Sequence, residues 1–342
     1  MDPSVEAFRT LYAQRNNGQL KSGFYNDNHL LTTDDGRRVV VRVPRATDDD
    51  LEPRRFDEAS VLRCVHVLGI NVPRLLWSDG EWGFQVQEFI EGDLMNEVCP
   101  RGRKVPGYFI DDVAYLFDSL SKLTDLETVR PAQQAWRRPA GCQDFFMMLL
   151  EWEVRVWESW FPRMAYFFEW IGLTASPFEP LRAAGNSLRD RRLVLCHGDV
   201  QRLNCLLRED TSWFLDWELA LQADPLWDVA THCHRMRYLP EEEISLMSKL
   251  AEIGRVTEAD LPDYRAYFDL ECLKSVVNDG VRYVAAAKKG ATDEQIAFFA
   301  TEYAWKLALA AKSTELQLRG CEELSQFLTV MRDGDTAPIE GR

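Results

Sequence analysis

Paired cysteines, excess basic charge and long apolar runs are all missing from this sequence. Its eight cysteines include no Cys-x-x-Cys pair, which argues against a zinc ribbon or a redox pair. With 55 acidic and 40 basic residues and a net charge of −15, the chain lacks the basic surface of a nucleic-acid or anionic-membrane binder. No apolar run approaches the roughly 18–20 residues that cross a bilayer. We therefore expect no nucleic-acid or membrane partner, whereas a cationic substrate is compatible with the charge.

Targeting and linker signals are equally sparse. Met1–Ser4 show no basic segment followed by an apolar one, so no secretory signal is visible. Together with cysteines that fit no disulfide framework, this predicts a reduced, cytoplasmic protein. Residues 339–342, Ile-Glu-Gly-Arg, match a protease-cleavage linker used in recombinant expression. We expect residues 335–342 to be a tail outside the fold.

The order of strand and helix patterns predicts an α+β fold. Asp34-Asp35-Gly36 separates two apolar segments, the pattern of a hairpin. A helix is predicted from Arg54 to Leu68, where Gly69 ends it, and a strand over Phe84–Phe89. Later residues follow a helical period, interrupted by a β-rich island. The island consists of Leu193–Cys196, Cys205–Leu207 and Trp213–Leu215, and the hairpin strands are Leu30–Thr33 and Arg37–Val43.

These patterns predict two lobes without internal repeats. The first is small and β-rich, over residues 1–90, and is expected to bind nucleotide. The second is larger and mostly helical, over residues 91–334, and is expected to hold catalytic and substrate-binding groups. We place the connection between them near residues 88–95.

The β-rich island carries the polar residues with the clearest chemistry. An apolar strand leads to His197 and Asp199, and Asn204 opens the next strand five residues after Asp199. A short hairpin returns the chain to Asp216, so Asn204 and Asp216 are expected at neighbouring strand ends. Amide and carboxylate oxygens there can share Mg²⁺. Asp199 can accept a proton from a substrate hydroxyl, which together with the metal is what phosphoryl transfer needs.

This segment resembles the catalytic and metal-binding loops of the aminoglycoside phosphotransferase and choline kinase family, a small-molecule branch of the protein-kinase-like fold. The family pattern H-G-D-x-x-x-x-N is matched by residues 197–204, and the later I/L-D-W/F by Leu215-Asp216-Trp217. The resemblance implies a two-lobed kinase-like fold and a catalytic loop containing His197, with Asp199 as the base. It also implies that Asn204 and Asp216 hold Mg²⁺.

A second pattern extends the resemblance. The stretch from Ala223 to Ala230 is similar to the family's G-D-P-x-x-D-L-A, in which Asp228 would brace the active-site loop. The resemblance covers most of residues 20–235 and is most specific over residues 193–230.

A buried charge in the first lobe fits the same chemistry. Arg42 interrupts Val39–Val43, a run otherwise typical of a buried strand, and therefore needs a partner or an anion. In the helix that follows, Glu58 lies on the apolar face with Val61 and Val65. We expect Arg42 and Glu58 to pair and to orient the guanidinium toward nucleotide phosphates, with Asp57 as the competing partner. The family resemblance supports this arrangement, since many members use an arginine there.

The remaining nucleotide contacts are less distinctive. Ser22 and Gly23 precede the first hairpin strand, and their backbone amides are candidates for a phosphate-binding loop, although an ordinary polar turn fits equally well. The resemblance alone implies that Glu88 and Ile90 offer backbone groups to adenine. The implied cofactors are ATP or GTP and Mg²⁺.

Two further features allow more than one interpretation. His232 and His234, two residues apart, cannot share a helix face, so they are expected as core or surface residues rather than metal ligands. In Phe145–Trp170, 10 of 26 residues are aromatic. These rings form either a helical core or a surface on which a substrate stacks.

We expect a small-molecule kinase that phosphorylates a hydroxyl group. No H-R-D, D-F-G or A-P-E signature of a protein kinase is present. Residues 209–280 hold 16 acidic and 6 basic residues, which favours an aminoglycoside antibiotic slightly over a nucleoside-type one. A metabolite kinase acting on choline, a sugar or an amino alcohol is the first alternative, and an inactive nucleotide-binding module is the second. No pattern indicates an oligomeric state.

Overall fold

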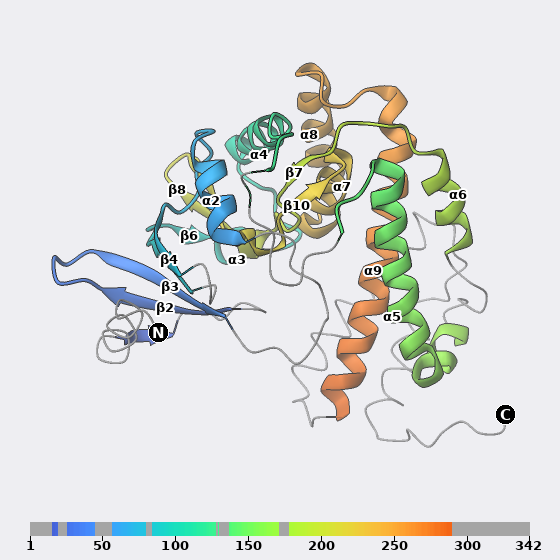
Figure 1. Ribbon diagram of the computed structural model, residues 1–342, viewed down its shortest axis with the longest axis horizontal. Coiled ribbons are helices and arrows are strands. Elements are labelled where there is room, and N and C mark those ends of the chain that lie inside the picture. Colours follow the sequence, from blue (N-terminus) through green and yellow to red (C-terminus); the bar gives the residue numbers. More distant parts are fainter. Residues whose placement is uncertain are drawn as a thin grey trace. The chain divides into compact units, whose positions relative to one another are not determined.

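The computed structural model describes residues 16–19, 26–44, 57–79, 84–127, 129, 137–170 and 178–288 (Figure 1). The chain divides into two compact units. Unit 1 contains Met1–Arg138 and Leu193–Val256, and unit 2 contains Pro139–Arg192 and Thr257–Arg342. The predicted α+β class is confirmed, because unit 1 combines antiparallel sheets with helices and the described part of unit 2 is helical. The connection placed near residues 88–95 stays a prediction.

Unit 1 begins with an antiparallel five-stranded sheet in the order β1-β2-β3-β5-β4. The predicted hairpin is present: β2 pairs with β3, and Gly36 at the turn has a φ of 81°, a conformation that glycine adopts without strain. One face of the sheet carries a cluster of buried apolar side chains, namely Leu31, Val39, Val41, Phe84 and Val86. The strands are β1 (Asn16–Gln19), β2 (Asn26–Thr32), β3 (Arg38–Pro44), β4 (Leu75–Asp79) and β5 (Phe84–Glu88).

Helix α2 (Glu58–His66) supplies the carboxylate expected beside this sheet. It begins at Glu58 because Asp57 is its N-cap and accepts a hydrogen bond from the Ser60 backbone N–H at 3.2 Å. Asp57 therefore caps the helix, whereas Glu58 is buried on the face that also buries Val61 and Val65. The predicted start at Arg54 lies outside the described residues.

The rest of unit 1 builds the support for the predicted catalytic loop. Strand β7 pairs with β10, and β8 pairs with both β6 and β9, which confirms the predicted β-rich island. The elements are β6 (Asp93–Leu94), α3 (Met95–Val98), α4 (Gly107–Leu120), β7 (Val194–Cys196), η1 (Arg202–Asn204), β8 (Cys205–Arg208), β9 (Thr211–Phe214), η2 (Trp217–Leu219), β10 (Leu221–Ala223), α7 (Pro225–Met236) and α8 (Pro240–Glu252).

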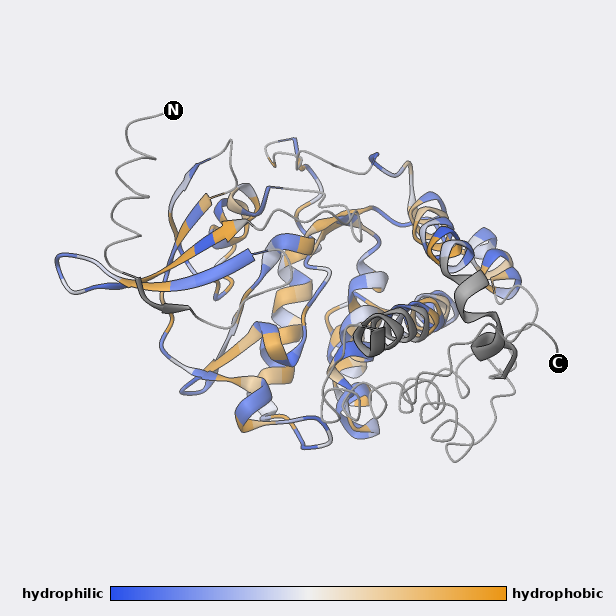
Figure 2. Ribbon diagram, turned by 90° about the horizontal axis from the view of Figure 1, so that it is seen from below, coloured by the Kyte–Doolittle hydropathy of each residue, from blue (hydrophilic) through white to orange (hydrophobic). Residues whose placement is uncertain are grey.

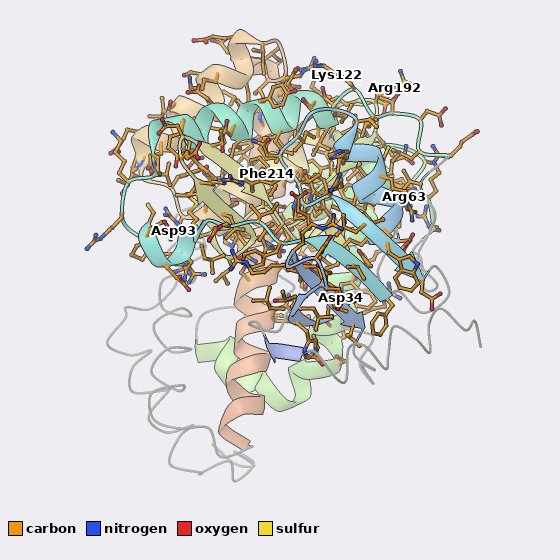
Figure 3. The ribbon with its side chains drawn as sticks, turned by 90° about the vertical axis from the view of Figure 1, so that its left-hand side faces the viewer. Asp34, Arg63, Asp93, Lys122, Arg192 and Phe214 are labelled. Carbon is orange, nitrogen blue, oxygen red and sulfur yellow. The ribbon has the colours of Figure 1, made fainter. Side chains whose placement is uncertain are left out.

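Helices α4 and α8 of unit 1 are amphipathic, whereas α7 is buried on nearly all sides. Helix α4 buries Phe109, Val113 and Leu116 and exposes Tyr115, and Figure 2 shows such division as orange and blue bands along the helix ribbons. In Figure 3, Phe214 of β9 lies among the packed side chains of this unit, in agreement with its exposure of 2%. The strands on either side of the predicted catalytic loop, β7 and β8, likewise bury Leu195 and Cys205.

Unit 2 contains long helices with an aromatic interior. The ring of Phe146 lies 5.2 Å from that of Tyr267, and the ring of Trp157 meets Phe178 edge-on at 5.7 Å. This part of the aromatic stretch is core; the side chains of residues 160–170 lie outside the description. No helix among the described residues is both long and apolar enough to cross a membrane. The elements are α5 (Cys142–Trp170), α6 (Glu179–Ser187), η3 (Glu258–Asp260) and α9 (Leu261–Lys288).

Candidate active site

The loop after β7 has a fixed backbone. Gly198 has a φ of 80°, and a Cβ there would lie 2.7 Å from the Leu219 carbonyl oxygen, so only glycine fits. The Asp228 carboxylate of α7 accepts the backbone N–H groups of His197 at 2.7 Å and Gly198 at 2.9 Å. Burial raises the pKa of Asp228 to about 6, while these two hydrogen bonds oppose the rise. Asp228 thus holds the residues that lead to Asp199.

The carboxylate of Asp199 is surrounded by hydrogen-bond donors. Gln201 Nε2 donates to Oδ1 at 2.9 Å and to Oδ2 at 3.0 Å, Asn204 Nδ2 donates to Oδ2 at 2.8 Å, and the Arg235 guanidinium forms an ion pair with Oδ1. A carboxylate offers about four lone-pair directions, so these donors fix its orientation closely. Burial raises the pKa of Asp199, and the Arg235 cation opposes that rise. Asp199 is therefore a closely oriented hydrogen-bond acceptor.

Asn204 and Asp216 come together as the sequence predicts. The backbone N–H of Leu215 donates to the Asn204 carbonyl at 2.8 Å, which joins the two strand ends. Asp216 has a φ of 63°, a left-handed conformation that aspartate tolerates better than most residues and that turns the chain into η2. Both residues belong to unit 1 and flank the loop of Asp199.

The donor set at these two residues fits magnesium. Asn204 uses its amide nitrogen toward the Asp199 backbone oxygen, at 2.9 Å, and toward its carboxylate, which leaves Oδ1 for a cation. Asp216 contributes a carboxylate. Among the described residues, no group of three or more His, Cys, Asp or Glu side chains is arranged for a metal. Mg²⁺ would thus complete its shell with phosphate oxygens and water, as it usually does.

Arg42 of β3 lies among three carboxylates. Its Nε is 3.2 Å from Glu58 Oε2, and its Nη2 is 2.6 Å from Asp216 Oδ1 and 3.3 Å from Glu218 Oε2. The expected Arg42–Glu58 ion pair is therefore present, and the orientation of the guanidinium toward nucleotide phosphates stays a prediction. Burial by itself lowers the pKa of Arg42, but the carboxylates, Glu58 first, raise it overall. Burial raises the pKa of Glu58, and Arg42 counteracts this.

Glu58 also connects α2 to the residues around Asp216. Its Oε1 accepts the Trp217 backbone N–H at 3.2 Å, and its Oε2 accepts from Gln85 Nε2 at 3.0 Å. Glu218 in turn accepts from Asn26 Nδ2 at 2.5 Å. The Arg42 guanidinium thus ties the five-stranded sheet to the loop that contains Asp216.

His197, predicted as part of the catalytic set, uses both ring nitrogens within the loop. Its Nε2 lies 3.1 Å from the Leu215 carbonyl oxygen and therefore donates, and its Nδ1 accepts the Asp199 backbone N–H at 3.3 Å. The ring packs against that of Trp217 with 4.2 Å between centroids and a tilt of 40° between the ring planes. Burial lowers the pKa of His197 to about 4, so the ring is neutral at pH 7. Both ring nitrogens of His197 thus bind backbone groups of this loop, and its catalytic role stays a prediction.

The structure does not test the other predicted nucleotide-binding residues, which are Ser22, Gly23, Glu88 and Ile90. Ser22 and Gly23 lie outside the described residues, so the proposed phosphate loop stays a prediction. Glu88 ends β5, and its backbone N–H donates to the Arg74 carbonyl at 2.9 Å. The Ile90 side chain is buried. The adenine-binding role of Glu88 and Ile90 also stays a prediction.

Three of the residues around the two charged groups were not predicted: Gln201, Glu218 and Arg235. Glu218 follows Asp216 by two residues, and the tight turn at η2 directs both toward Arg42. Gln201 follows Asp199 by two residues in the same loop. Arg235 lies seven residues after Asp228, which is two helical turns and therefore the same face of α7. Of the three, only Arg235 could have been found from the sequence, through its seven-residue spacing from Asp228.

Known proteins can now be compared with this arrangement. The family model described as "Phosphotransferase enzyme family" matches residues 18–267, more than half of the chain. No curated protein is significantly similar to the chain in sequence. The matched range contains every site residue described above.

Solved structures give the fold. The chain is similar to a thermostable mutant of aminoglycoside phosphotransferase APH(4)-Ia in a ternary complex with AMP-PNP and hygromycin B, with a TM-score of 0.59 and 16% identity over 92% of this chain and 98% of that chain. It is also similar to a choline/ethanolamine kinase family protein from Mesorhizobium loti, with a TM-score of 0.56 and 17% identity over 97% of this chain and 99% of that chain. A third similar structure is choline kinase LicA from Streptococcus pneumoniae, with a TM-score of 0.55 and 15% identity over 91% of this chain and 98% of that chain.

At 15–17% sequence identity the structural similarity shows the fold alone, and the match to the family model shows which family the chain belongs to. Both agree with the resemblance carried by residues 197–204 and 215–217. The chain belongs to the phosphotransferase enzyme family, and its fold is that of the protein-kinase-like small-molecule kinases.

Proposed function

We propose that this protein transfers the γ-phosphoryl group of ATP or GTP to a hydroxyl group of a small molecule. The observation that supports this most strongly is the link between Asp199 and Asn204. One amide side chain orients the acceptor carboxylate with its nitrogen and offers its oxygen to a metal. The hydrogen bond of 2.8 Å from Asn204 Nδ2 to Asp199 Oδ2 therefore links the proposed proton acceptor directly to a proposed metal ligand.

Each residue has a defined role in the proposed reaction. The substrate oxygen forms a bond to the γ-phosphorus as the bond to the β,γ-bridging oxygen breaks, and Asp199 accepts the hydroxyl proton. Asn204 and Asp216 would hold Mg²⁺, which would neutralise charge on the phosphate oxygens. Arg42 orients Asp216 and, through it, the metal ligand set. Because the donor is a cytoplasmic nucleotide, we place the protein in the cytoplasm.

The acceptor is proposed to be an antibiotic, either an aminoglycoside or a nucleoside-type compound. The sequence favoured a polycation because residues 209–280 are acidic, yet much of this charge has internal partners. Asp224 caps α7, Glu242 accepts the Val105 backbone N–H, and Asp263 pairs with Arg191. Arg235 moreover places a cation on the base itself. These contacts weaken the electrostatic argument for a polycation, so an aminoglycoside and a nucleoside-type antibiotic are both proposed as acceptors, with choline, a sugar or an amino alcohol as the alternative.

A panel of acceptors tests this proposal. The protein is incubated with Mg²⁺ and ATP or GTP, and with nucleoside antibiotics, aminoglycosides, choline, sugars and amino alcohols. A mass gain of one phosphate identifies the product. The proposal predicts phosphorylation of an antibiotic hydroxyl; an acceptor KM that rises steeply with ionic strength indicates an aminoglycoside, and a KM that changes little indicates a nucleoside-type antibiotic. Turnover of choline or a sugar alone contradicts the antibiotic acceptor, and nucleotide binding without any transfer favours the inactive module.

A further inference from the structure

Helix α7 presents one face to the catalytic loop. Asp228, His232 and Arg235 are spaced by four and three residues and therefore lie on the same side of the helix. Asp228 accepts the backbone N–H groups of His197 and Gly198. The other two residues hold the part of the loop that follows. The four consecutive residues 197–200 are thus each bound by one of three side chains from a single helix.

His232 is the middle contact of this face. Its Nδ1 lies 2.9 Å from the carbonyl oxygen of Val200, the residue directly after Asp199. Because a carbonyl oxygen only accepts, Nδ1 carries the hydrogen. Nε2 is then an acceptor, and it lies 2.8 Å from the hydroxyl of Tyr238, which donates to it. The tautomer of His232 is therefore fixed by its two partners.

The imidazole is also fixed in position and charge. It is 1% exposed, and its ring meets that of Phe117 edge-on at 5.5 Å and that of Tyr238 at 5.2 Å. A third ring, that of Phe109, lies at 6.4 Å. Burial lowers the pKa of His232 to about 3, so the ring stays neutral across the physiological range. A neutral, caged imidazole provides one rigid donor.

We propose that His232 is a positioning residue for phosphoryl transfer, which acts on Asp199 through the Val200 carbonyl. Asp228 holds the two amides before Asp199, and His232 holds the carbonyl after it. The backbone of Asp199 therefore lies between two anchors on one helix. A carboxylate must meet the acceptor hydroxyl within hydrogen-bond distance, and rotation of its backbone would misplace it. This inference rests on the proposed function.

The test compares His232→Leu with His232→Asn and with His234→Leu. His234 lies on the same helix with a matched exposure of 2%. Its spacing of two residues from His232 places it about 200° further around the helix, away from the face that contacts the loop. Asparagine can place an amide N–H where Nδ1 was, so it restores the donor, whereas leucine does not. We expect His232→Leu to lower kcat by about 10–100-fold with the nucleotide KM changed by less than about twofold. His232→Asn recovers most of the loss, and His234→Leu keeps kcat near the wild-type value.

Hydrogen–deuterium exchange gives a readout that does not need turnover. Peptides covering residues 197–204 should exchange faster in His232→Leu than in His234→Leu or the wild type. If wild-type protein transfers no phosphate but the exchange pattern holds, the proposed function fails while the anchoring stands. Equal kcat losses in His232→Leu and His234→Leu, or unchanged exchange in the loop, overturn the positioning role.

Tyr238→Phe covers the case in which His232→Leu does not fold. It keeps the ring and removes only the hydroxyl that donates to Nε2. We expect a severalfold loss of kcat and a smaller rise in loop exchange. If kcat and the exchange rate of the loop were both unchanged in Tyr238→Phe, the hydrogen bonds from Tyr238 to His232 and from His232 to Val200 would not position Asp199.

Discussion

Two clusters of charged and polar side chains in unit 1, called here the Arg42 pocket and the Asp199 pocket, contain hydrogen-bond donors and carboxylate acceptors in opposite proportions. In the Arg42 pocket, one guanidinium contacts the carboxylates of Glu58, Asp216 and Glu218, all within 3.3 Å. In the Asp199 pocket, one carboxylate accepts hydrogen bonds from Gln201, Asn204 and Arg235. The first pocket has an excess of acceptors and the second an excess of donors.

The difference indicates what each pocket is suited to hold. The formal charges of the Arg42 pocket are one positive and three negative, a net of −2. Such a pocket still attracts a cation, and Asp216, the predicted metal ligand, belongs to it. The Asp199 pocket contains one negative and one positive charge. It is neutral overall and restricts the orientation of a single carboxylate, as proton acceptance requires.

The largest effect is expected from breaking the Asp199 pocket at its centre. Asp199→Asn keeps the shape of the side chain but removes the proton acceptor. We expect kcat to fall by about 10²–10⁴-fold, equivalent to about 3–5 kcal/mol. Steady-state phosphate transfer measures the change. Near-normal turnover of this variant would show that another group accepts the proton.

The second effect concerns the Asp228 carboxylate beneath the same pocket. Burial raises its pKa to about 6, above the value near 3.9 of an unfolded chain. The folded state therefore binds this proton more tightly, and stability from this group falls as pH rises from about 4 to 6, by an amount on the order of 2–3 kcal/mol. Asp228→Asn removes this dependence.

Chemical denaturation of wild type and Asp228→Asn at several pH values measures it. His197 and His232 change stability in the opposite direction over this range, since burial lowers their pKa values to about 4 and about 3. The difference between the two proteins isolates Asp228. Parallel pH curves would mean that Asp228 titrates as it does in the unfolded chain.

A smaller effect is expected from removing one charge of the Arg42 pocket. In Glu58→Gln, Arg42 loses its nearest competing anion and binds Asp216 more tightly, which makes Asp216 a poorer metal ligand. We expect the nucleotide KM to rise by up to about tenfold, about 1.4 kcal/mol, with kcat less affected. Glu97→Gln, an exposed charge change on α3, is the control. An unchanged KM in Glu58→Gln would separate Arg42 from nucleotide binding.

The smallest effect is expected from Arg235→Met. The variant removes the cation on Asp199 Oδ1, but Gln201 and Asn204 still donate to the carboxylate. We expect kcat to fall by only about three- to tenfold and the nucleotide KM to stay constant. A loss as large as that of Asp199→Asn would mean that the ion pair, rather than the amide donors, orients the base.

The sequence predicts those residues of the two pockets that are placed by a regular strand, hairpin or helix pattern. Asn204 and Asp216 were predictable because a short hairpin brings their strand ends together. The Arg42–Glu58 pair was predictable because each charge interrupts an apolar pattern. The fold class followed from the same alternation and helical periods, reinforced by the family resemblance.

The contacts that were missed depend on backbone details without a periodic signature. Glu218 reaches Arg42 because Asp216 adopts a left-handed φ of 63° and η2 turns the chain back. Gln201 reaches Asp199 through an irregular loop. His232 looked like a core histidine, and it is one; its role follows from the Val200 carbonyl, which a sequence pattern does not reveal.

The division of roles between the two pockets can be measured directly by nucleotide binding. Calorimetric titration of AMP-PNP, with and without Mg²⁺, is carried out on the wild type, Asp199→Asn and Asp216→Asn. The wild type and Asp199→Asn should bind the nucleotide more tightly when Mg²⁺ is present, by a similar factor. Asp216→Asn should lose this gain because Asp216 no longer supplies a carboxylate to the metal. Loss of the gain in Asp199→Asn, or its retention in Asp216→Asn, would contradict the assignment of the metal to Asp216 and of the base to Asp199.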